Sequence, residues 1–352
     1  MTGWPTRNWG CRIGTCIIEG MNAVLIENRV LRVTVLADKG AELVELLHKP
    51  TDVDVLWRAP TGILNPARGV ASVATTAGAF MDAYGGGWQE LFPTLGAPTE
   101  YYGAAMGEHG EVALLPWDVT IDRDDPDAVS VTFAVQCRRS PFRLRRTLTL
   151  EGAASPTLQL DEVAVNEGGE TLELMWGHHP VFGPPFLEPG CSIRLPGGQV
   201  QAVKPTDGVF LPQGEATEWP RYVTTDGPEA DLSVVGPGSP QQVDELYVRG
   251  LPDGWYQITN QRLAVGFELR WDVEVFPYLW WWRTLGPAAG YPWYSRTFML
   301  GLEPFSSVPP DFRSAAREGT TLKLRPGQTR SCRLEATIFT LGEAGSEELR
   351  VS

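Results

Sequence analysis

The chain has 352 residues, of which 43% are hydrophobic and 20% are charged, and its formal net charge is −14. This apolar content can form a sizeable core, which excludes a globally disordered protein. The excess of acidic residues argues against nucleic acid or an anionic membrane as a partner. The length alone would allow two domains, but large all-β folds often fit such a length into one.

Neither a secretion signal nor a membrane helix is expected. Residues 1–20 contain no continuous apolar segment, and even the aromatic run at 278–282 ends at Arg283. The five cysteines are odd in number, scattered and never spaced as CxxC, which argues against a disulfide framework and a zinc knuckle. A reducing, cytoplasmic location fits this pattern best.

Short apolar runs separated by glycine and proline dominate the chain, which holds 38 glycines and 29 prolines. This spacing predicts a mostly β protein, and the β-branched and aromatic residues in the runs favour strands over helices. The expected strands, in chain order, are residues 24–35, 112–121, 129–136, 142–150, 157–166, 172–176, 255–258, 263–271 and 332–340. Only residues 310–317 read as a short helix.

So many strands without βαβ alternation predict an all-β fold, a large antiparallel β-sandwich whose sheets bury one another. We expect one domain over residues 1–352. Residues 196–220 have no clear period and are expected to form long loops over one end of the sheets. Functional residues should then gather on loops and strand faces at one concave surface.

The sequence lacks GxxxxGK[ST], GxSxG and HExxH, which lowers the expectation of a nucleotide-binding enzyme, a serine hydrolase or a zinc protease. Its four histidines can be weighed singly. His48 lies in an apparent turn and is expected to be an ordinary solvated residue. His109 lies between Gly107 and Gly110, where the chain can approach a ligand closely, so it is either a turn residue or a ligand contact.

His178 and His179 follow an apolar strand and precede Pro180. Adjacent strand residues point to opposite faces, so only one imidazole can face a given pocket and the other is structural. Pro180 cannot donate a ladder hydrogen bond and stiffens this segment, which favours fixed placement of the ring that faces the pocket.

Glu303 ends an apolar strand, where a buried carboxylate is costly unless it has a partner. It either forms a salt bridge with Arg283 or Arg296, or acts as a general base in a pocket. The nearby aromatic run places Trp280 and Trp282 on one face. This run either packs in the core or lines a carbohydrate pocket with an indole such as Trp282, because the flat face of a pyranose stacks on aromatic rings.

Four segments in this order resemble the aldose 1-epimerase (galactose mutarotase-like) superfamily. They are GGWQELFPTLG at residues 86–96, His109 with Gly110, the asparagine turn at 165–168 leading into His-Pro-Val-Phe at 179–182, and Gly-Leu-Glu-Pro at 301–304. The resemblance implies a β-supersandwich that interconverts the α and β anomers of aldoses without a cofactor or metal. It implies that His179 is the general acid, Glu303 the general base, His109 a second imidazole that contacts the sugar, and Asp244 a sugar-binding aspartate.

The chemistry agrees with this assignment. Opening a cyclic hemiacetal removes the proton of the C1 hydroxyl and protonates the ring oxygen, so one base and one acid must flank the sugar. A histidine with a pKa of about 6.5 can serve as the acid at neutral pH, more so if an anionic partner raises that pKa. We therefore expect a mutarotase that binds a small-molecule carbohydrate, as a monomer or homodimer.

Departures from the family pattern argue against recognition of a sugar phosphate. Glu111 and Val112 stand where the hexose-6-phosphate branch has an aromatic residue and arginine, and Tyr84 replaces an arginine before the glycine cluster. Two rival functions stay open. One is a non-catalytic carbohydrate-binding or regulatory protein on the same fold. The other is an isomerase or hydrolase in which His109, His179 and Glu303 ligate zinc or manganese.

Overall fold

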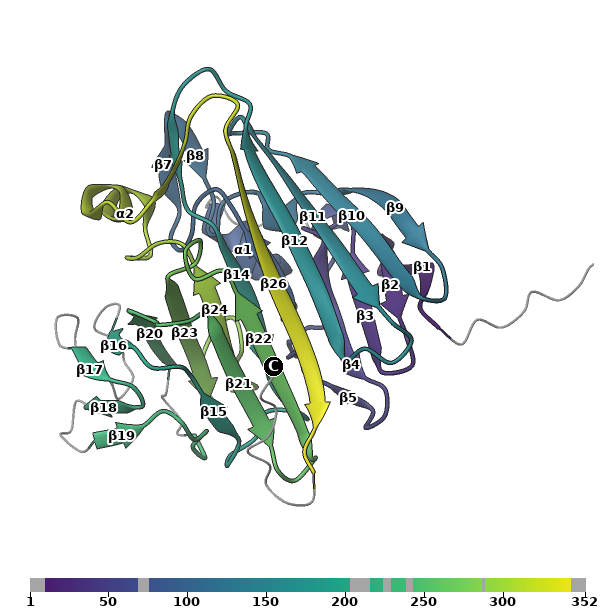
Figure 1. Ribbon diagram of the computed structural model, residues 1–352. Helices are drawn as coiled ribbons and strands as arrows, with labels where there is room; N and C mark the ends of the chain where they lie inside the picture. The colour runs from purple at the N-terminus through teal and green to yellow at the C-terminus, as the bar shows by residue number, and fades with distance from the viewer. Residues whose placement is uncertain are drawn as a thin grey trace, which may run out of the picture.

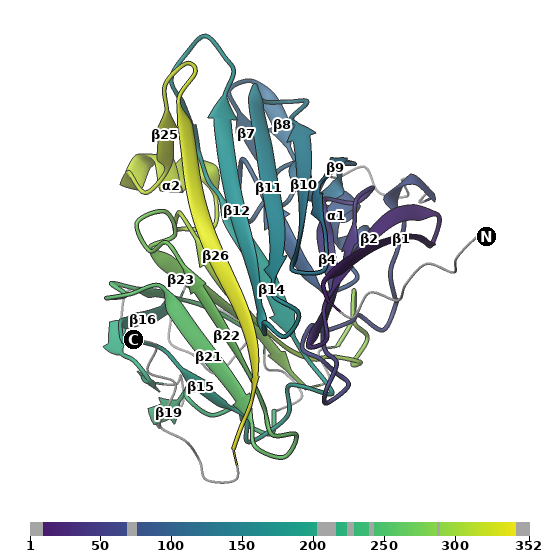
Figure 2. The same cartoon turned by 45° about the vertical axis from the view of Figure 1, so that its right-hand side comes forward.

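The computed structural model describes residues 10–68, 76–202, 216–223, 229–238, 243–286 and 289–342. Two large antiparallel sheets dominate these residues and stack against each other (Figures 1 and 2). The prediction of an all-β antiparallel sandwich is confirmed. Within the described residues, no helix combines the length and the apolar character needed to cross a membrane.

The larger sheet has twelve described strands. In spatial order they are β1 (Arg12–Ile18), β2 (Met21–Glu27), β3 (Leu31–Leu36), β4 (Glu42–His48), β6 (Trp88–Leu91), β14 (Gly177–Phe182), β24 (Phe298–Phe305), β23 (Tyr278–Leu285), β20 (Val243–Arg249), β16 (Gln199–Ala202) and β17 (Ala216–Glu218), with β5 (Val53–Asp54) paired to β4. Segments far apart in sequence therefore meet in its middle, at β6, β14, β24 and β23.

The second sheet has eight described strands and lies in front of the first in Figure 1. Its order is β15 (Ser192–Arg194), β21 (Trp255–Asn260), β22 (Val265–Trp271), β26 (Thr329–Thr340), β12 (Thr157–Asn166), β11 (Phe142–Glu151), β10 (Ala128–Gln136) and β9 (Asp118–Asp124). Three two-stranded sheets complete the strands: β7 (Thr99–Tyr101) with β8 (Ala104–Met106), β13 (Leu172–Leu174) with β25 (Leu322–Leu324), and β18 (Arg221–Val223) with β19 (Glu229–Asp231).

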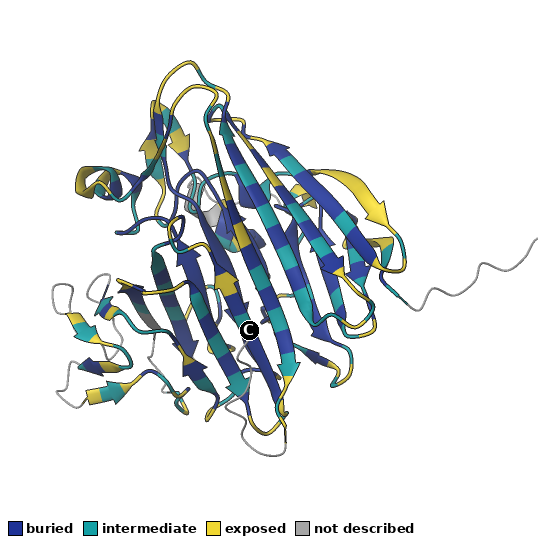
Figure 3. Ribbon diagram, in the orientation of Figure 1, coloured by how far each residue is buried: buried dark blue, intermediate teal, exposed yellow. Residues whose placement is uncertain are grey.

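The burial pattern shows where the core ends and where a site can form. Residues of β12 alternate between buried and partly exposed, as in a strand with one face on the core and one towards solvent (Figure 3). In contrast, every residue of β14 is buried, and so is every residue of β24 except Phe298. The middle of the larger sheet is thus covered on both faces. The second sheet covers one face, and α1 (Thr76–Ala83) and loops cover the other.

Two expected strands are divided in the structure. Residues 24–35 form the hairpin of β2 and β3, because the Asn28 side chain accepts hydrogen bonds from the backbone N–H groups of Val30 and Leu31 and closes a turn. Residues 112–121 begin as a short 3-10 helix, Val112–Leu114, and β9 starts only at Asp118. Pro116 separates the two, since it has no N–H to continue a ladder.

The helix expected at residues 310–317 is α2 (Phe312–Glu318). Asp311 caps its first turn by accepting from the Ser314 N–H, and Gly319 ends it in the left-handed conformation. Helix α1 was not expected from the sequence. The loops expected over 196–220 contain β16 and β17, and residues 203–215 lie outside the described part of the chain.

Candidate active site

His179 and Glu303 lie opposite each other on neighbouring strands of the larger sheet. Val181 of β14 pairs with Gly301 of β24, and the same register two residues along places His179 opposite Glu303. Directly opposed residues of a ladder point to the same face of the sheet. His179 Nε2 lies 3.4 Å from Glu303 Oε1, and both side chains are buried. The described side-chain partner of Glu303 is thus the His179 imidazole.

These two side chains face a pocket of about 470 Å³, within the range of about 300–1,000 Å³ typical of small-molecule sites. Strands β14, β20, β23 and β24 contribute to one side and α1 to another. The lining is rich in aromatic rings and acidic groups: Phe80, Tyr84, Trp280, Trp282, Tyr291 and Trp293, with the carboxylates of Glu108, Glu245 and Glu303. Such a lining suits a ligand with a flat apolar face and several hydroxyl groups.

His109 enters the same pocket from the loop after β8. Its backbone φ of 61° lies in the left-handed region, and Gly110 follows with φ of 81°. A Cβ on Gly110 would lie 2.4 Å from the Phe92 carbonyl oxygen, so this turn needs glycine. The Gly96 N–H donates to His109 Nδ1 at 3.2 Å, which leaves the proton of the neutral ring on Nε2. The His109 and His179 ring centroids are 5.4 Å apart.

Burial controls the protonation of the pocket. It lowers the pKa of His179 to about 4 and, with the nearby His179, holds the pKa of His109 well below 6.5. Burial and the neighbouring Glu245 carboxylate raise the pKa of Glu303 well above 4.5. The expectation of a pKa near 6.5 or higher for His179 is therefore wrong, because desolvation of the imidazolium outweighs attraction to the carboxylate. Burial therefore favours the uncharged form of the pair, in which Glu303 rather than His179 holds the proton.

Trp282 lines the pocket together with Trp280, and its ring centroid is 5.5 Å from that of His179. Trp281 lies between them in sequence and is a buried core residue. The side chain of Asp244 lies outside the described part of the structure. The next residue of β20, Glu245, lines the pocket, and side chains alternate along a strand. The described pocket-lining carboxylate of β20 is thus Glu245.

His178 belongs to a buried polar network between the two sheets. The Trp88 indole donates to His178 Nδ1 at 3.2 Å, and His178 Nε2 lies 3.0 Å from Glu162 Oε2 of β12. Because Nδ1 accepts from Trp88, the proton of the neutral ring lies on Nε2 and is donated to Glu162. Burial lowers the pKa of His178 to about 4, which keeps the ring neutral. Its role is structural, on the face of β14 opposite to His179.

Arg146 and Glu90 complete this network. Arg146 Nη1 lies 3.3 Å from Glu90 Oε2, and neither side chain is exposed. Arg146 also donates to the Ala41 carbonyl oxygen and lies over the Trp117 ring at 5.5 Å. The Trp176 indole donates to the other Glu90 oxygen. The guanidinium offsets part of the cost of burying Glu90, although burial and the nearby Glu162 carboxylate still raise the pKa of Glu90 to about 8.

A metal ion held by His109, His179 and Glu303 is not supported. Among the described side chains, ligand atoms gather closely enough for an ion only in the buried network, at the two carboxylates and His178, within 4.8 Å of one another. There the His178 nitrogen that faces the carboxylates carries a proton, and Arg146 already provides a cation. The group fits a hydrogen-bonded cluster rather than a metal site.

The expectation that His48 is a solvated turn residue is wrong. His48 is the last residue of β4 and is buried, with Nδ1 2.8 Å from Thr51 Oγ1. Strand β5 returns directly onto this end of β4 and places Val53 opposite His48. Strand β5 thus covers the His48 imidazole, which we expected in an open turn.

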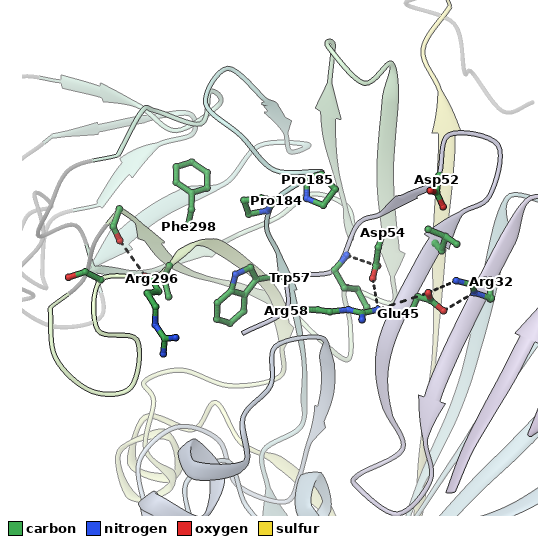
Figure 4. Close-up of a pocket in the computed structure, with 15 residues that line it drawn as sticks. Arg32, Glu45, Asp52, Asp54, Trp57, Arg58, Pro184, Pro185, Arg296 and Phe298 are labelled. Atoms are coloured by element: carbon green, nitrogen blue, oxygen red, sulfur yellow. Dashed lines mark hydrogen bonds and ion pairs between the residues drawn. The ribbon is translucent and has the colours of Figure 1, made fainter. Parts of the chain in front are cut away.

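A second hollow has a volume of about 770 Å³ and is drawn in Figure 4. Trp57 lines it and packs edge-on against Trp293 of the candidate active site, with ring centroids 5.1 Å apart. Several charged side chains in this hollow are ion-paired with one another, as with Arg58 and Asp54 at 3.2 Å. It has no buried acid–base pair among its described lining residues, so the chemistry is assigned to the first pocket.

The match to a known family spans nearly the whole chain. The family is a domain of unknown function, DUF4432, and its model matches residues 18–338. The chain belongs to this family. No curated protein matches it. The match includes every described residue that lines the candidate active site.

Solved structures show which fold this DUF4432 chain shares. A candidate aldose 1-epimerase from Klebsiella pneumoniae superposes with a TM-score of 0.74 at 16% identity, covering 93% of this chain and 83% of the other. A galactose mutarotase-like protein from Clostridium acetobutylicum gives 0.61 at 16% identity, covering 94% and 99%. A galactose mutarotase related enzyme from Lactobacillus acidophilus gives 0.57 at 16% identity, covering 94% and 100%. At such identities the likeness establishes a galactose mutarotase-like fold.

Several pocket residues of the DUF4432 chain were not singled out from the sequence as ligand contacts. Phe80 lies in α1, which no pattern predicted, and Tyr84 follows it directly. Trp293 lies in an irregular segment whose fold no local pattern specifies. Glu245 could have been considered from the sequence, because side chains alternate along β20 and place Glu245 on the opposite face from Asp244.

Proposed function

We propose that this protein is an aldose 1-epimerase, a mutarotase that interconverts the α and β anomers of a free sugar. The observation that carries the proposal is the contact between a buried carboxyl group, Glu303, and a buried imidazole, His179. They lie 3.4 Å apart and face one pocket. The mutarotase-like fold and the aromatic lining, on which a pyranose can stack, support the same function.

Ring opening needs two proton transfers at one sugar. The Glu303 carboxylate accepts the proton of the C1 hydroxyl, the His179 imidazolium gives its proton to the ring oxygen, and the C1–O5 bond breaks. The pair reaches this charged form when its single proton moves from Glu303 to His179 across the 3.4 Å contact. The products are an open-chain aldehyde, a protonated Glu303 and a neutral His179.

Closure on the other face of the aldehyde completes the exchange. Rotation about the C1–C2 bond presents the opposite face of the carbonyl to the C5 hydroxyl. His179 then accepts the proton of that hydroxyl, Glu303 protonates the carbonyl oxygen, and the C1–O5 bond forms again. Protons and electrons balance over the cycle. A neutral His109, with its proton on Nε2, is placed to donate a hydrogen bond to the sugar.

The proton count of the pair predicts an exchange rate that changes little around neutral pH. The exchange rate should decrease at pH values below about 4, because a second proton then converts His179 to an imidazolium while Glu303 stays protonated. No base is then left to accept the C1 proton. At high pH, loss of the proton from Glu303 removes the acid. The measurement is kcat/KM for anomer exchange from about pH 3.5 to 9, corrected for spontaneous mutarotation. An acid limb near pH 6.5 would contradict the assignment of His179 as neutral.

Magnetisation-exchange NMR of anomeric protons tests the function directly. The panel consists of free aldoses, uronic acids and deoxy sugars, with His179→Ala as the inactive control. Enhanced α/β exchange for at least one sugar, lost in the variant, is the expected result. Binding without exchange across the panel would instead favour a non-catalytic carbohydrate-binding protein.

A further inference from the structure

Gln89 extends the acid–base pair into a row of opposed side chains across the larger sheet. It lies opposite His179 in the ladder between β6 and β14, and Glu303 lies opposite His179 in the ladder between β14 and β24. Directly opposed residues point to the same face of a sheet, with Cβ atoms about 4.5–5.5 Å apart. The His179 imidazole is therefore flanked by a carboxyl group on one side and by an amide on the other.

The amide of Gln89 has a fixed orientation and one unused acceptor. Its Nε2 donates to the Gly86 carbonyl oxygen, and the side chain also hydrogen-bonds Glu42. A flipped amide would place its oxygen against these two acceptors, so the network fixes the orientation. Gln89 is 2% exposed, and its Oε1 has no hydrogen-bond partner among the described residues. Buried polar groups are normally paired, so this oxygen requires a donor.

A buried ion pair lies on the other side of the amide. The ladder between β4 and β6 places Glu42 beside Gln89, on the side away from His179. Lys39 Nζ lies 2.7 Å from Glu42 Oε2, and both side chains are buried. An amide that donates to a carboxyl group is polarised, which makes its own oxygen a better acceptor.

The second ring nitrogen of His179 is the matching donor. Nε2 faces Glu303 at 3.4 Å, so Nδ1 is left for the other neighbour in the row. Nδ1 is buried without a hydrogen-bond partner among the described residues, and the interaction of the ring with its own backbone does not pair it. The terminal torsion of a glutamine is broad, so the amide oxygen can turn towards Nδ1 at little cost.

Nδ1 carries a hydrogen at each step of the proposed reaction. When Glu303 holds the proton of the pair, it donates to Nε2, and the hydrogen of the neutral ring lies on Nδ1. In the imidazolium both nitrogens carry a hydrogen. Ring opening removes the Nε2 proton and ring closure returns it, while Nδ1 keeps its own. An acceptor at Nδ1 therefore holds the ring in the tautomer that the reaction needs.

We propose that Gln89 is a positioning residue for the acid–base step: its amide oxygen accepts a hydrogen bond from His179 Nδ1–H and holds Nε2 towards Glu303 and the sugar. The inference deepens the proposed mutarotase function and rests on it. Gln89 is not among the described residues that line the pocket, so it acts through His179 rather than on the sugar. Its loss should lower kcat and leave KM unchanged.

The tautomer of His179 tests the contact without any sugar. The chain has four histidines, so a nitrogen-15 NMR spectrum of labelled rings is simple enough to assign by substitution. We expect the proton of neutral His179 on Nδ1. His109 and His178 provide the contrast, because their Nδ1 atoms accept hydrogen bonds and their protons lie on Nε2. Gln89→Met removes the acceptor at similar length and should move the His179 Nδ1–H signal upfield.

Anomer-exchange kinetics test the consequence for the reaction. Gln89→Met should lower kcat by roughly tenfold, about the value of one hydrogen bond, with KM within about twofold of wild type. Gln89→Glu keeps an acceptor oxygen and should retain the Nδ1–H signal and most of kcat. If Gln89→Met does not fold, Gln89→Asn replaces it, because the shorter amide withdraws the acceptor from Nδ1.

Gln257→Met is the matched control. Gln257 also donates its amide to a glutamate, at 2.6 Å from Glu268 Oε2, but it lies in β21 of the second sheet. Its variant should keep the wild-type His179 signals, kcat and KM. A neutral His179 with its proton on Nε2, an Nδ1–H signal unmoved in Gln89→Met, or an unchanged kcat in that variant would each overturn the inference.

Failure of the mutarotase function itself would show differently. If no sugar of the panel exchanges but the Nδ1–H signal depends on Gln89, the hydrogen bond is supported and the catalytic role of the pair is rejected. If a sugar exchanges but Gln89→Met changes neither the signal nor kcat, the mutarotase function is supported and the role of Gln89 is rejected.

Discussion

Replacing Glu303 with glutamine is expected to slow catalysed anomer exchange by roughly 10²–10⁴-fold, the range that one positioned proton transfer contributes. Glutamine keeps the shape of the side chain but cannot accept the C1 proton or pass one to His179, 3.4 Å away. His179→Ala should cause a loss of similar size. The measurement is single-sugar exchange NMR, with the spontaneous rate subtracted and the thermal midpoint recorded to show that the fold persists.

Glu245→Gln is the matched control for this pair. Glu245 lines the same pocket, but the acid–base contact of the site is made by Glu303 and His179. Its replacement removes a charge that raises the pKa of Glu303 but leaves the acid–base pair in place, so kcat should fall far less than in Glu303→Gln or His179→Ala. Near-normal turnover in both Glu303→Gln and His179→Ala would refute the proposed acid–base roles.

Arg146→Met is expected to lower the free energy of unfolding by about 3–5 kcal/mol, the usual cost of removing one partner from a buried ion pair. Arg146 is unexposed, pairs with Glu90 at 3.3 Å and donates to the Ala41 carbonyl oxygen. Without the guanidinium, Glu90 stays between the sheets with one donor fewer and no compensating charge. Urea denaturation of the two proteins measures the difference.

Arg145→Met provides the comparison within the same strand. Arg145 is the preceding residue of β11 and is exposed, so its replacement should change stability by no more than about 0.5 kcal/mol. Adding Glu90→Gln to Arg146→Met should recover part of the loss, because it removes the unpaired carboxyl group. A loss below about 1 kcal/mol in Arg146→Met would show that the ion pair contributes little.

Local patterns in the sequence were enough for the fold class and for most strands of the second sheet. Residues 157–166 alternate as a half-buried strand must and form β12 with those bounds. The helix at 312–318 is marked by the Asp311 cap and Gly319. The points at which proline and asparagine end a strand were harder to predict. Pro116 and the Asn28 turn each divide a segment that hydrophobicity alone reads as one strand.

The candidates for acid–base chemistry could be chosen from residue types alone, because a chain with four histidines offers few choices. Strand alternation required that only one of His178 and His179 face a pocket. It could not say which, and the family resemblance supplied the choice of His179. No local pattern indicated that the other ring would join Glu162 and Trp88 in a buried network.

The surroundings of these residues depend on the folded chain and could not be predicted from local patterns. His179 and Glu303 are 124 positions apart and meet because β14 and β24 pair in one register, which depends on the whole sheet. Burial then sets the proton on Glu303 and keeps His179 neutral, against the ordinary pKa values of both groups. Desolvation depends on every atom packed around a group, so neighbours in sequence cannot determine it. For the same reason, Tyr84 and Glu245 became visible as pocket residues only once the chain was folded.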